Sequence, residues 1–378
     1  MAAVRGRREG FMEFLILVFI TSFFVVLLST PSLIKVAILK RLFDAPGDTR
    51  KLHTRMVPTI GGIIIFAGTL FSYSLWFPDK QIHEYPQLAK SISDYKFIVS
   101  TLLVMFFVGV KDDIIGTAPV KKLVAHVLVG MVLVLMADIK IVSMHGLFGL
   151  EVLPLWTSVF LSLFTYIVVV NAFNLIDGVD GLAGGVGLIA ATAFGCWFAM
   201  AGDPAMACLA FSLSGALFGF LFFNFSPAKI FMGDSGSLTI GLIVCILAIK
   251  VIDYDVSNIE NTVVLHVSKP IFAMAVLVYP LVDTLRIFIY RAVRGVSPFS
   301  ADRNHLHHRL IDLGLSHKGT VLTVYFVNIF IITLTIGLSF TNINANYILM
   351  IVAGASLTLA QIPFFIKKKK NRTVKENA

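Results

Sequence analysis

Four polar side chains recur at three-residue intervals between two long apolar runs, at Asn171, Asn174, Asp177 and Asp180. Residues three apart lie on adjoining turns of one helical face, so two amides and two carboxylates would gather at the end of one membrane helix. The glycines that follow let the backbone break and approach a ligand closely. Oxygen ligands of this kind suit a hard divalent cation and the group that this cation holds. A polar connecting loop that happens to carry acids is the alternative, and the apolar residues between the polar positions disfavour it.

An adjacent pair of carboxylates, Asp112 and Asp113, follows the third apolar run of the chain. Adjacent carboxylates repel each other, so the pair is stable only with a cation, a proton or a basic partner nearby. Lys111, Lys121 and Lys122 are candidates for that partner, and an incoming phosphate could share them. Such a pair on its own is more often a solvated loop. Because it is one of three acidic connections, a chemical role is favoured here.

The third acidic connection carries Asn224, Lys229, Phe231 and Asp234. Two glycines flank Asp234 at the predicted start of a helix, where free backbone N–H groups favour an anion such as phosphate. Asp234 would hold a divalent ion that bridges phosphate oxygens, and Phe231 could stack on a base. The structural alternative is that Asp234 and Ser235 form no more than an N-cap.

The longest polar loop carries three histidines and an arginine, at His305, His307, His308 and Arg303. Histidines next to arginines make a basic patch that suits phosphate or sugar oxygens. A zinc site is the competing interpretation, but zinc sites mostly add Cys or a fixed His pair on a helix, and no Cys lies in this loop. Arg50 and His53 lie in a second cationic loop, which could equally be an anchor on the cytoplasmic side.

Membrane helices must position these motifs, because 57% of the 378 residues are hydrophobic and only 14% are charged. Soluble domains carry roughly 25% charged residues. A helix needs about 20 apolar residues to cross the hydrocarbon, and by that measure the chain has about eleven transmembrane helices. They lie near Phe11–Leu28, Thr59–Phe77, Phe97–Val110, Val120–Ala137, Leu153–Val170, Leu182–Ala201, Ala205–Phe223, Ser237–Ile249, Ile271–Tyr290, Val321–Phe340 and Tyr347–Ile366. The expected fold is an all-α integral membrane protein, a single polytopic domain over residues 1–378 with cytoplasmic catalytic loops. Asp283 and Arg286, one turn apart in the ninth span, most simply form an ion pair.

The basic residues predict how the chain is oriented. An odd number of spans places the termini on opposite sides, and Lys and Arg favour the cytoplasmic side. Most of the 31 basic residues fall on that side if the N-terminus is outside and the C-terminus, with its basic tail 367–378, is cytoplasmic. This assignment also makes the three acidic connections and the histidine loop cytoplasmic. The chemistry is therefore expected at the inner membrane surface.

Taken together, these blocks closely resemble the polyprenyl-phosphate N-acetylhexosamine-1-phosphate transferases, of the glycosyltransferase 4 family. The matching pieces are Asp112-Asp113, the blocks 171–185 and 224–236, and His305-Leu306-His307-His308, within about residues 44 to 310. The His-x-His-His form, with Arg50 and His53, resembles the WecA/TagO branch. The related MraY branch has three consecutive histidines and a Lys shortly after its Asp pair. Ile114-Ile115-Gly116 follow the pair here, so that lysine role would pass to Lys121 or Lys122.

The resemblance implies transfer of an N-acetylhexosamine 1-phosphate, with GlcNAc as the favoured sugar, from a UDP-sugar to undecaprenyl phosphate. UMP leaves, and a lipid-linked diphosphate sugar for envelope polymers such as O-antigen or teichoic acid remains in the bacterial inner membrane. The family carries Mg2+, with Mn2+ as an alternative metal, on the aspartate that matches Asp234, with support from the Asn174 position. Its uridine pocket maps onto Asn224 and Phe231, and its Asp-Asp pair activates the lipid phosphate.

The hypothesis is thus phosphoryl transfer by positioning and charge neutralisation. Asp112 acts as a base or phosphate positioner, an acidic shell is formed by Asp113, Asp177 and Asp180, and Asp234 binds the metal. Substrate binding is assigned to Asn171, Asn224, Lys229, Phe231, His305, His307, His308, Arg303, Lys121, Lys122, Arg50 and His53. Two rivals remain: the same reaction on UDP-MurNAc-pentapeptide, as in MraY, and an ion-coupled transporter or flippase, whose coupling acids would lie near mid-span. The sugar epimer, direct or two-step transfer, and a homodimeric state stay open.

Overall fold

A computed structural model describes residues 2–40, 57–79, 88–257, 259, 261–295 and 305–366. Arg50, His53 and Arg303 lie outside these ranges, as does the basic tail 367–378. Within the described ranges helices make up most of the chain, and an isolated β-bridge pairs Ser143 with Val152.

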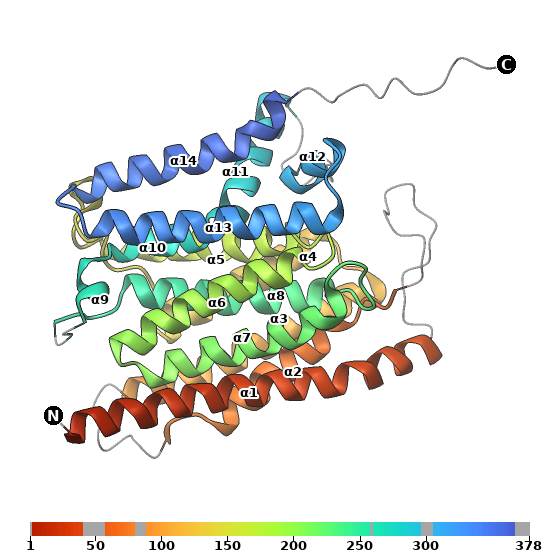
Figure 1. Cartoon of the computed structure of the whole chain (residues 1–378), viewed down its shortest axis with the longest axis horizontal. Coiled ribbons are helices and arrows are strands. Elements are labelled where there is room, and N and C mark those ends of the chain that lie inside the picture. Colours follow the sequence, from red (N-terminus) through yellow and green to blue (C-terminus); the bar gives the residue numbers. More distant parts are fainter. Residues whose placement is uncertain are drawn as a thin grey trace.

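Most of the helices are long and apolar, with a few short helices between them (Figure 1). The first half comprises α1 (Ala2–Leu39), α2 (Gly61–Leu75), α3 (Leu88–Ile115), α4 (Pro119–Met131), its π-helical end η2 (Val132–Met136), the 3-10 turn η3 (Leu147–Gly149) and α5 (Leu155–Leu175). The second half comprises α6 (Leu182–Ala201), α7 (Pro204–Asn224), α8 (Gly233–Ile252), α9 (Thr262–His266), α10 (Lys269–Val276), α11 (Val278–Val293), α12 (Leu306–Asp312), α13 (His317–Ser339) and α14 (Ala345–Phe365). An apolar helix satisfies its backbone N–H and C=O groups within one segment, as a membrane requires.

Eight of the described helices are long and apolar enough to cross a membrane, and the bent pair α10 and α11 makes a ninth if it is counted as one span. Helix α2 is apolar but only 15 residues long, and α3 has 28 residues with charged side chains at both ends. Each predicted span nevertheless falls on a described helix or on two consecutive ones. The predicted class, an all-α integral membrane protein, is confirmed.

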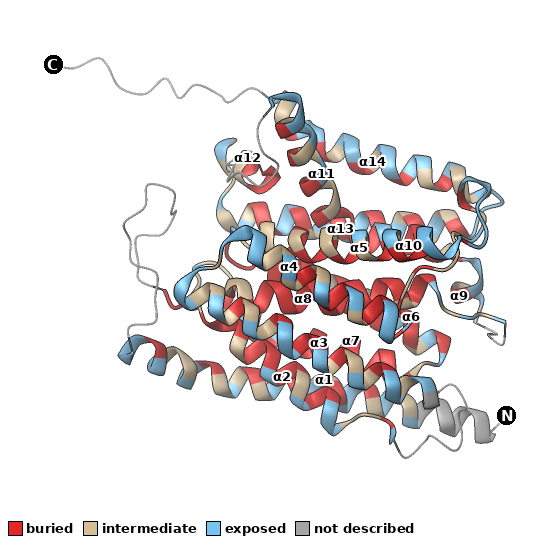
Figure 2. Cartoon of the chain, turned by 180° about the vertical axis from the view of Figure 1, so that it is seen from behind, coloured by how far each residue is buried: buried red, intermediate tan, exposed pale blue. Residues whose placement is uncertain are grey.

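Helix α8 forms the centre of the bundle, and Figure 2 shows it buried along its length. Helices α2, α3, α5 and α6 are among those that pack around it. Gly62 of α2 and Gly109 of α3 approach the first turn of α8 at Ser235 so closely that a Cβ on either glycine would have no room. Small residues permit such close approach of membrane helices. The start of α8 is therefore within reach of the ends of several neighbours.

The ninth predicted span, Ile271–Tyr290, is interrupted in the structure, because α10 and α11 meet at an angle of 74°. Pro280 has no N–H to bond the carbonyl of Val276, so a regular helix cannot continue through this point. The side chain of Asn328 in α13 donates to that carbonyl instead, at 3.4 Å. The break gives α11 a direction of its own, toward the histidine motif of α12.

The two ends of the bundle differ in what they carry. Helix α1 begins at the end where α9 lies, and α14 ends toward the other, where α12 lies (Figure 1). The described chain therefore starts and stops at opposite ends, as an odd number of crossings predicts. Which end faces the cytoplasm stays a prediction from the basic residues.

Candidate active site

Four helices bring polar side chains together at the start of α8. Lys122 of α4 binds Asp234 of α8 in an ion pair, and its Nζ also lies 3.4 Å from Asp112 Oδ2 of α3 and 3.5 Å from Asn174 Oδ1 of α5. Asn174 Nδ2 donates to Asp234 Oδ1 at 2.8 Å. The carboxyls of Asp112 and Asp234 lie within hydrogen-bonding reach of each other. The sequence left the lysine role open between two residues; the structure places Lys122 in this cluster and leaves Lys121 exposed.

This cluster has the donor chemistry of a magnesium site. Oxygen atoms of Asp112, Asn174 and Asp234 surround one positive charge, the ammonium of Lys122. Mg2+ in proteins commonly uses one or two carboxylates and takes its other ligands from water and substrate phosphates. Among the described residues no group of three or more His, Cys, Asp or Glu side chains is arranged to hold a metal ion. A metal ion held by the oxygens of this cluster would take its remaining ligands from water or substrate phosphates.

Asp177 faces the same cluster from the connection between α5 and α6. Burial raises the pKa of the Asp177 carboxyl well above its usual range, and the nearby carboxylates of Asp234 and Asp113 raise it further. The backbone N–H of Gly233 donates to Asp177 and opposes this shift. A cation at the cluster would lower the cost of ionising Asp177, because opposite charge favours the charged form.

Asp113 has a different task from its neighbour Asp112. Its Oδ1 accepts from the backbone N–H of Asp234 at 2.6 Å, and its Oδ2 accepts from that of Ser235 at 3.0 Å. A carboxylate at a helix N-terminus satisfies free N–H groups and complements the helix dipole. The sequence predicted phosphate at this helix start and alternatively an N-cap by Asp234 itself. In the structure Asp113 occupies these two N–H groups, and the Asp234 side chain is directed to Lys122.

Two further predicted site residues connect backbone segments. Asp180 Oδ2 accepts from the N–H of Ala228 at 3.0 Å. Asn224 Oδ1 accepts from the N–H of Gly181 at 3.0 Å, and its Nδ2 donates to the carbonyl of Ile230 at 2.9 Å. Both side chains are buried. Their hydrogen bonds link the 176–181 connection to the 225–232 connection. The side-chain amide of Asn224, predicted for the uridine pocket, therefore binds the protein's own backbone.

Three more predicted residues lie around the cluster without joining it. Asn171 Nδ2 donates to Ile167 O at 2.7 Å and lies 3.2 Å from His126 Nδ1, one turn deeper in the bundle. Lys229 is exposed and Phe231 is half-buried. The exposed Lys229 could reach a ligand at this end of the bundle, whereas Asn171 is engaged one turn deeper in α5.

The histidine motif reaches the acidic cluster through the 176–181 connection. A Cβ built on Gly178 would lie 3.1 Å from His307 Nε2, so the imidazole rests directly against this backbone. Burial lowers the pKa of His307 to about 3, which keeps the ring neutral at ordinary pH. His305 is buried and His308 is half-buried. The motif therefore borders the 176–181 connection, which carries Asp177 and Asp180.

Sequence reasoning missed several side chains that position the site. Tyr325 of α13 donates to the carbonyl of Gly181, and His126 contacts Asn171. Tyr279 OH lies 3.3 Å from His307 Nδ1. A polar or ionisable residue inside an apolar span is the signal that could have identified them, because such groups are costly unless they are paired.

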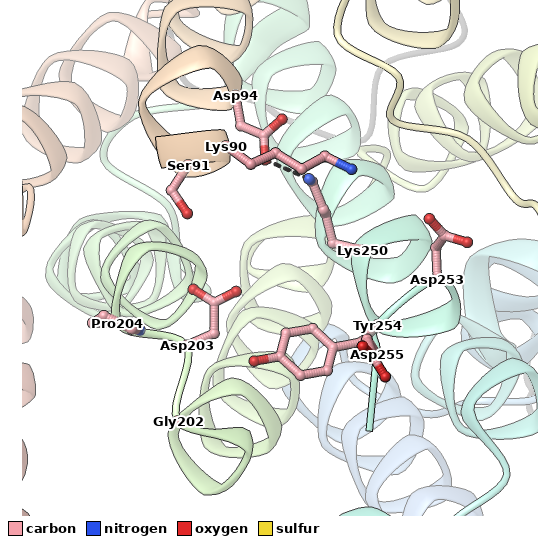
Figure 3. Close-up of a pocket in the computed structure, with 10 residues that line it drawn as sticks. All are labelled: Lys90, Ser91, Asp94, Gly202, Asp203, Pro204, Lys250, Asp253, Tyr254 and Asp255. Carbon is pink, nitrogen blue, oxygen red and sulfur yellow. Dashed lines mark hydrogen bonds and ion pairs between the residues drawn. The ribbon is translucent and has the colours of Figure 1, made fainter. Parts of the chain in front are cut away.

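The polar cavity in Figure 3 lies at the other end of α8, far from the acidic cluster. Asp94 and Lys250 pair across it at 2.5 Å, and Asp203 and Tyr254 also line it. Asp203 caps α7 by accepting from the N–H groups of Ala205 and Met206. Lys250 is in the last turn of α8, whereas Asp234 is in the first. This cavity is therefore separate from the candidate site.

Comparison with known proteins places the acidic cluster inside a recognised sequence family. Residues 95–252 match the model of "Glycosyl transferase family 4". The chain is 32% identical over 293 residues to the decaprenyl-phosphate N-acetylglucosaminephosphotransferase of Mycobacterium leprae (strain TN), covering 73% of this chain and 72% of the relative. It is 30% identical over 318 residues to a probable undecaprenyl-phosphate N-acetylglucosaminyl 1-phosphate transferase of Bacillus subtilis (strain 168), covering 83% and 82%. It is 28% identical over 289 residues to the undecaprenyl-phosphate alpha-N-acetylglucosaminyl 1-phosphate transferase of Escherichia coli O157:H7, covering 75% and 73%.

Proposed function

The chain belongs to glycosyl transferase family 4, among the polyprenyl-phosphate sugar-1-phosphate transferases, and we propose that it transfers GlcNAc 1-phosphate from UDP-GlcNAc to undecaprenyl phosphate. UMP is the leaving group, and a lipid-linked diphosphate sugar is the product. The observation that carries this proposal is the meeting of Asp112, Lys122, Asn174 and Asp234 at one end of the bundle. A soluble donor and a lipid acceptor can meet only at such a membrane boundary.

The residues of this cluster fit phosphoryl transfer, which depends on positioning and charge neutralisation more than on covalent help. Asn174 fixes the Asp234 carboxylate through its amide N–H group. When bound to Asp234 and Asn174, Mg2+ would neutralise the donor diphosphate and favour departure of UMP. Lys122 lies between Asp112 and Asp234 and would neutralise the acceptor phosphate. Asp113 binds backbone N–H groups, whereas Asp112 does not, so Asp112 would position that phosphate for attack.

The neutral, buried imidazole of His307 would support the 176–181 connection beside the bound sugar phosphate rather than carry a charge to it. Its Nδ1 lies next to the Tyr279 hydroxyl, and its Nε2 is directed to Gly178 beside the acidic cluster. His308, half-buried on the same helix, would contact the sugar phosphate itself. The basic-residue pattern supports a cytoplasmic position for this site. The bacterial relatives support the bacterial inner membrane as its location.

The proposal is tested by incubating the purified protein with undecaprenyl phosphate, Mg2+ and a panel of UDP-sugars, and measuring UMP. UDP-GlcNAc should give UMP and a lipid-linked diphosphate sugar, each dependent on the lipid. UMP release only with UDP-MurNAc-pentapeptide would replace the proposed donor, and no UMP with any donor would defeat the proposed reaction. Chelation of Mg2+ should stop release, and added Mg2+ should restore it.

A further inference from the structure

A buried carboxylate in α11 holds the histidine motif. Asp283 is 1% exposed and accepts from His305 Nδ1 at 2.7 Å and from the backbone N–H of Leu306 at 2.8 Å. Arg286, one turn along α11, lies 3.3 Å from the same carboxylate. The sequence predicted only the Asp283–Arg286 ion pair. In the structure Asp283 also accepts two hydrogen bonds from the histidine motif.

The face of α11 that carries Asp283 also contacts a second histidine. Tyr279 and Asp283 are four residues apart, which places them on one helical face. The Tyr279 hydroxyl lies 3.3 Å from His307 Nδ1, just as Asp283 binds His305 Nδ1. The rings of His305 and His307 are stacked with centroids 5.4 Å apart. One face of α11 therefore holds both rings by the same nitrogen.

Holding Nδ1 has a chemical consequence. The hydrogen bond made by one imidazole nitrogen sets the protonation and direction of the other. With Nδ1 of His305 on Asp283, Nε2 is the nitrogen left for a ligand. The ion pair with Arg286 is enough to compensate the charge of Asp283. The hydrogen bonds to His305 and Leu306 are therefore not needed for charge compensation, and they fix the orientation of the histidine motif.

We propose that Asp283 is a positioning residue that acts through His305, setting the imidazole and the start of α12 so that the histidine motif meets the substrate phosphates. This inference rests on the proposed function for its substrate. The break between α10 and α11 is what makes it possible, because it directs the Tyr279–Asp283 face of α11 to the motif. Asn328 satisfies the carbonyl that the break exposes.

The first test is a double-mutant cycle on kcat/KM for the sugar nucleotide. Asp283→Asn should lower kcat/KM about 10- to 100-fold, since a buried hydrogen bond to a charged group is lost. In a His305→Ala background the same change should cost little more, because Asp283 acts through that ring. Equal losses in both backgrounds would overturn the proposal.

Asp94→Asn is the matched control. Asp94 is also a buried carboxylate with a basic partner, Lys250, and is 4% exposed. It is 18 residues before Asp112 on α3, about 27 Å along the helix axis. Asp94→Asn should lower the thermal midpoint but leave kcat/KM near that of the wild type. If Asp283→Asn has no larger effect on kcat/KM than Asp94→Asn, Asp283 has only a structural role.

A second measurement does not depend on turnover. Hydrogen–deuterium exchange in α12, residues 306–312, should accelerate about tenfold or more in Asp283→Asn, because the Leu306 N–H loses its charged acceptor. Exchange in the central helix α8 should not change. Unchanged protection of α12 would overturn the positioning role. A wild-type protein that releases no UMP would defeat the proposed function alone, and the exchange result would still decide the role of Asp283.

Discussion

Changing Asp112 and Asp113 separately to Asn should separate activity from stability at two adjacent positions. Asp113 accepts hydrogen bonds from the N–H groups of Asp234 and Ser235 with its two oxygens. Asp112 instead faces Lys122 at 3.4 Å and is partly exposed. The substitution is the same, the residues are adjacent, and only the direction of the side chain differs.

The magnitude follows from these contacts. Asp113→Asn keeps one oxygen acceptor but turns an NH2 group toward a backbone N–H, so one charge-assisted hydrogen bond is lost at a cost of about 1.5–3 kcal/mol. For a chain of this length that loss lowers the thermal midpoint by about 2–4 °C. Asp112→Asn weakens a partly exposed ion pair, which costs less than about 1 kcal/mol. Its effect should fall on transfer, by about 100-fold or more, because a charge in the reacting centre is removed.

Both variants are measured by thermal unfolding in detergent and by UMP release. Asp113→Asn should show the larger fall in midpoint, and Asp112→Asn should unfold near the wild-type temperature while transfer is lost. A wild-type midpoint for Asp113→Asn would refute the assignment of Asp113 as the cap of α8. Normal turnover in Asp112→Asn would refute its place in the reacting centre.

Three further outcomes follow from the site. Asp234→Asn should reduce transfer by about 100-fold or more at ordinary Mg2+, and near-normal turnover would contradict its assignment as metal ligand. Lys122→Gln should lose transfer to a similar extent while Lys121→Gln, at an exposed neighbour, stays near the wild type; equal effects would show that Lys122 has no special place. Burial lowers the pKa of His307 from 6.5 to about 3, so the unfolded chain binds more protons between these values and stability falls as the pH drops through them. Acidification from pH 7 to pH 5 should therefore cost about 2 kcal/mol more in the wild type than in His307→Gln, measured by thermal unfolding, and the same acid sensitivity in both would contradict a buried neutral ring.

The sequence was sufficient for the fold class and for the polar residues that gather at one end of the bundle. Long apolar runs can only be membrane helices, and spacing in threes places Asn174 and Asp177 at the end of one of them. Which partner each polar side chain takes depends on how the helices pack, and spacing carries no information about that. The sequence therefore could not show that Asn224, predicted to bind substrate, and Asp180, predicted to join the acidic shell, also bind backbone groups of neighbouring connections.

The clearest case is the break between α10 and α11, which a hydropathy window passes over. Pro280 is the residue in the sequence that indicates a break, but a membrane helix tolerates proline when a neighbouring side chain binds the backbone carbonyl that proline leaves without a donor. Here that neighbour is Asn328, 48 positions further along the chain. A pattern within one span could therefore not show that α11 turns its polar face toward the histidine motif.

Helix geometry also explains why an adjacent acidic pair cannot act as one unit. Successive residues on an α-helix are about 100° apart, so two neighbouring carboxylates at the end of α3 must face different partners. The Asp113 side chain points to the start of α8, where it accepts hydrogen bonds from two backbone N–H groups. The Asp112 side chain points to α4, where it lies next to Lys122 and remains partly exposed. From the sequence we expect a cation, a proton or a basic partner to relieve the repulsion between the two carboxylates. In the structure Asp112 has the basic partner Lys122, and Asp113 has two backbone N–H partners. The pair thus combines one residue that fixes the start of α8 with one that stays available for chemistry, and any reading of the motif that gives both the same role conflicts with the geometry of the helix.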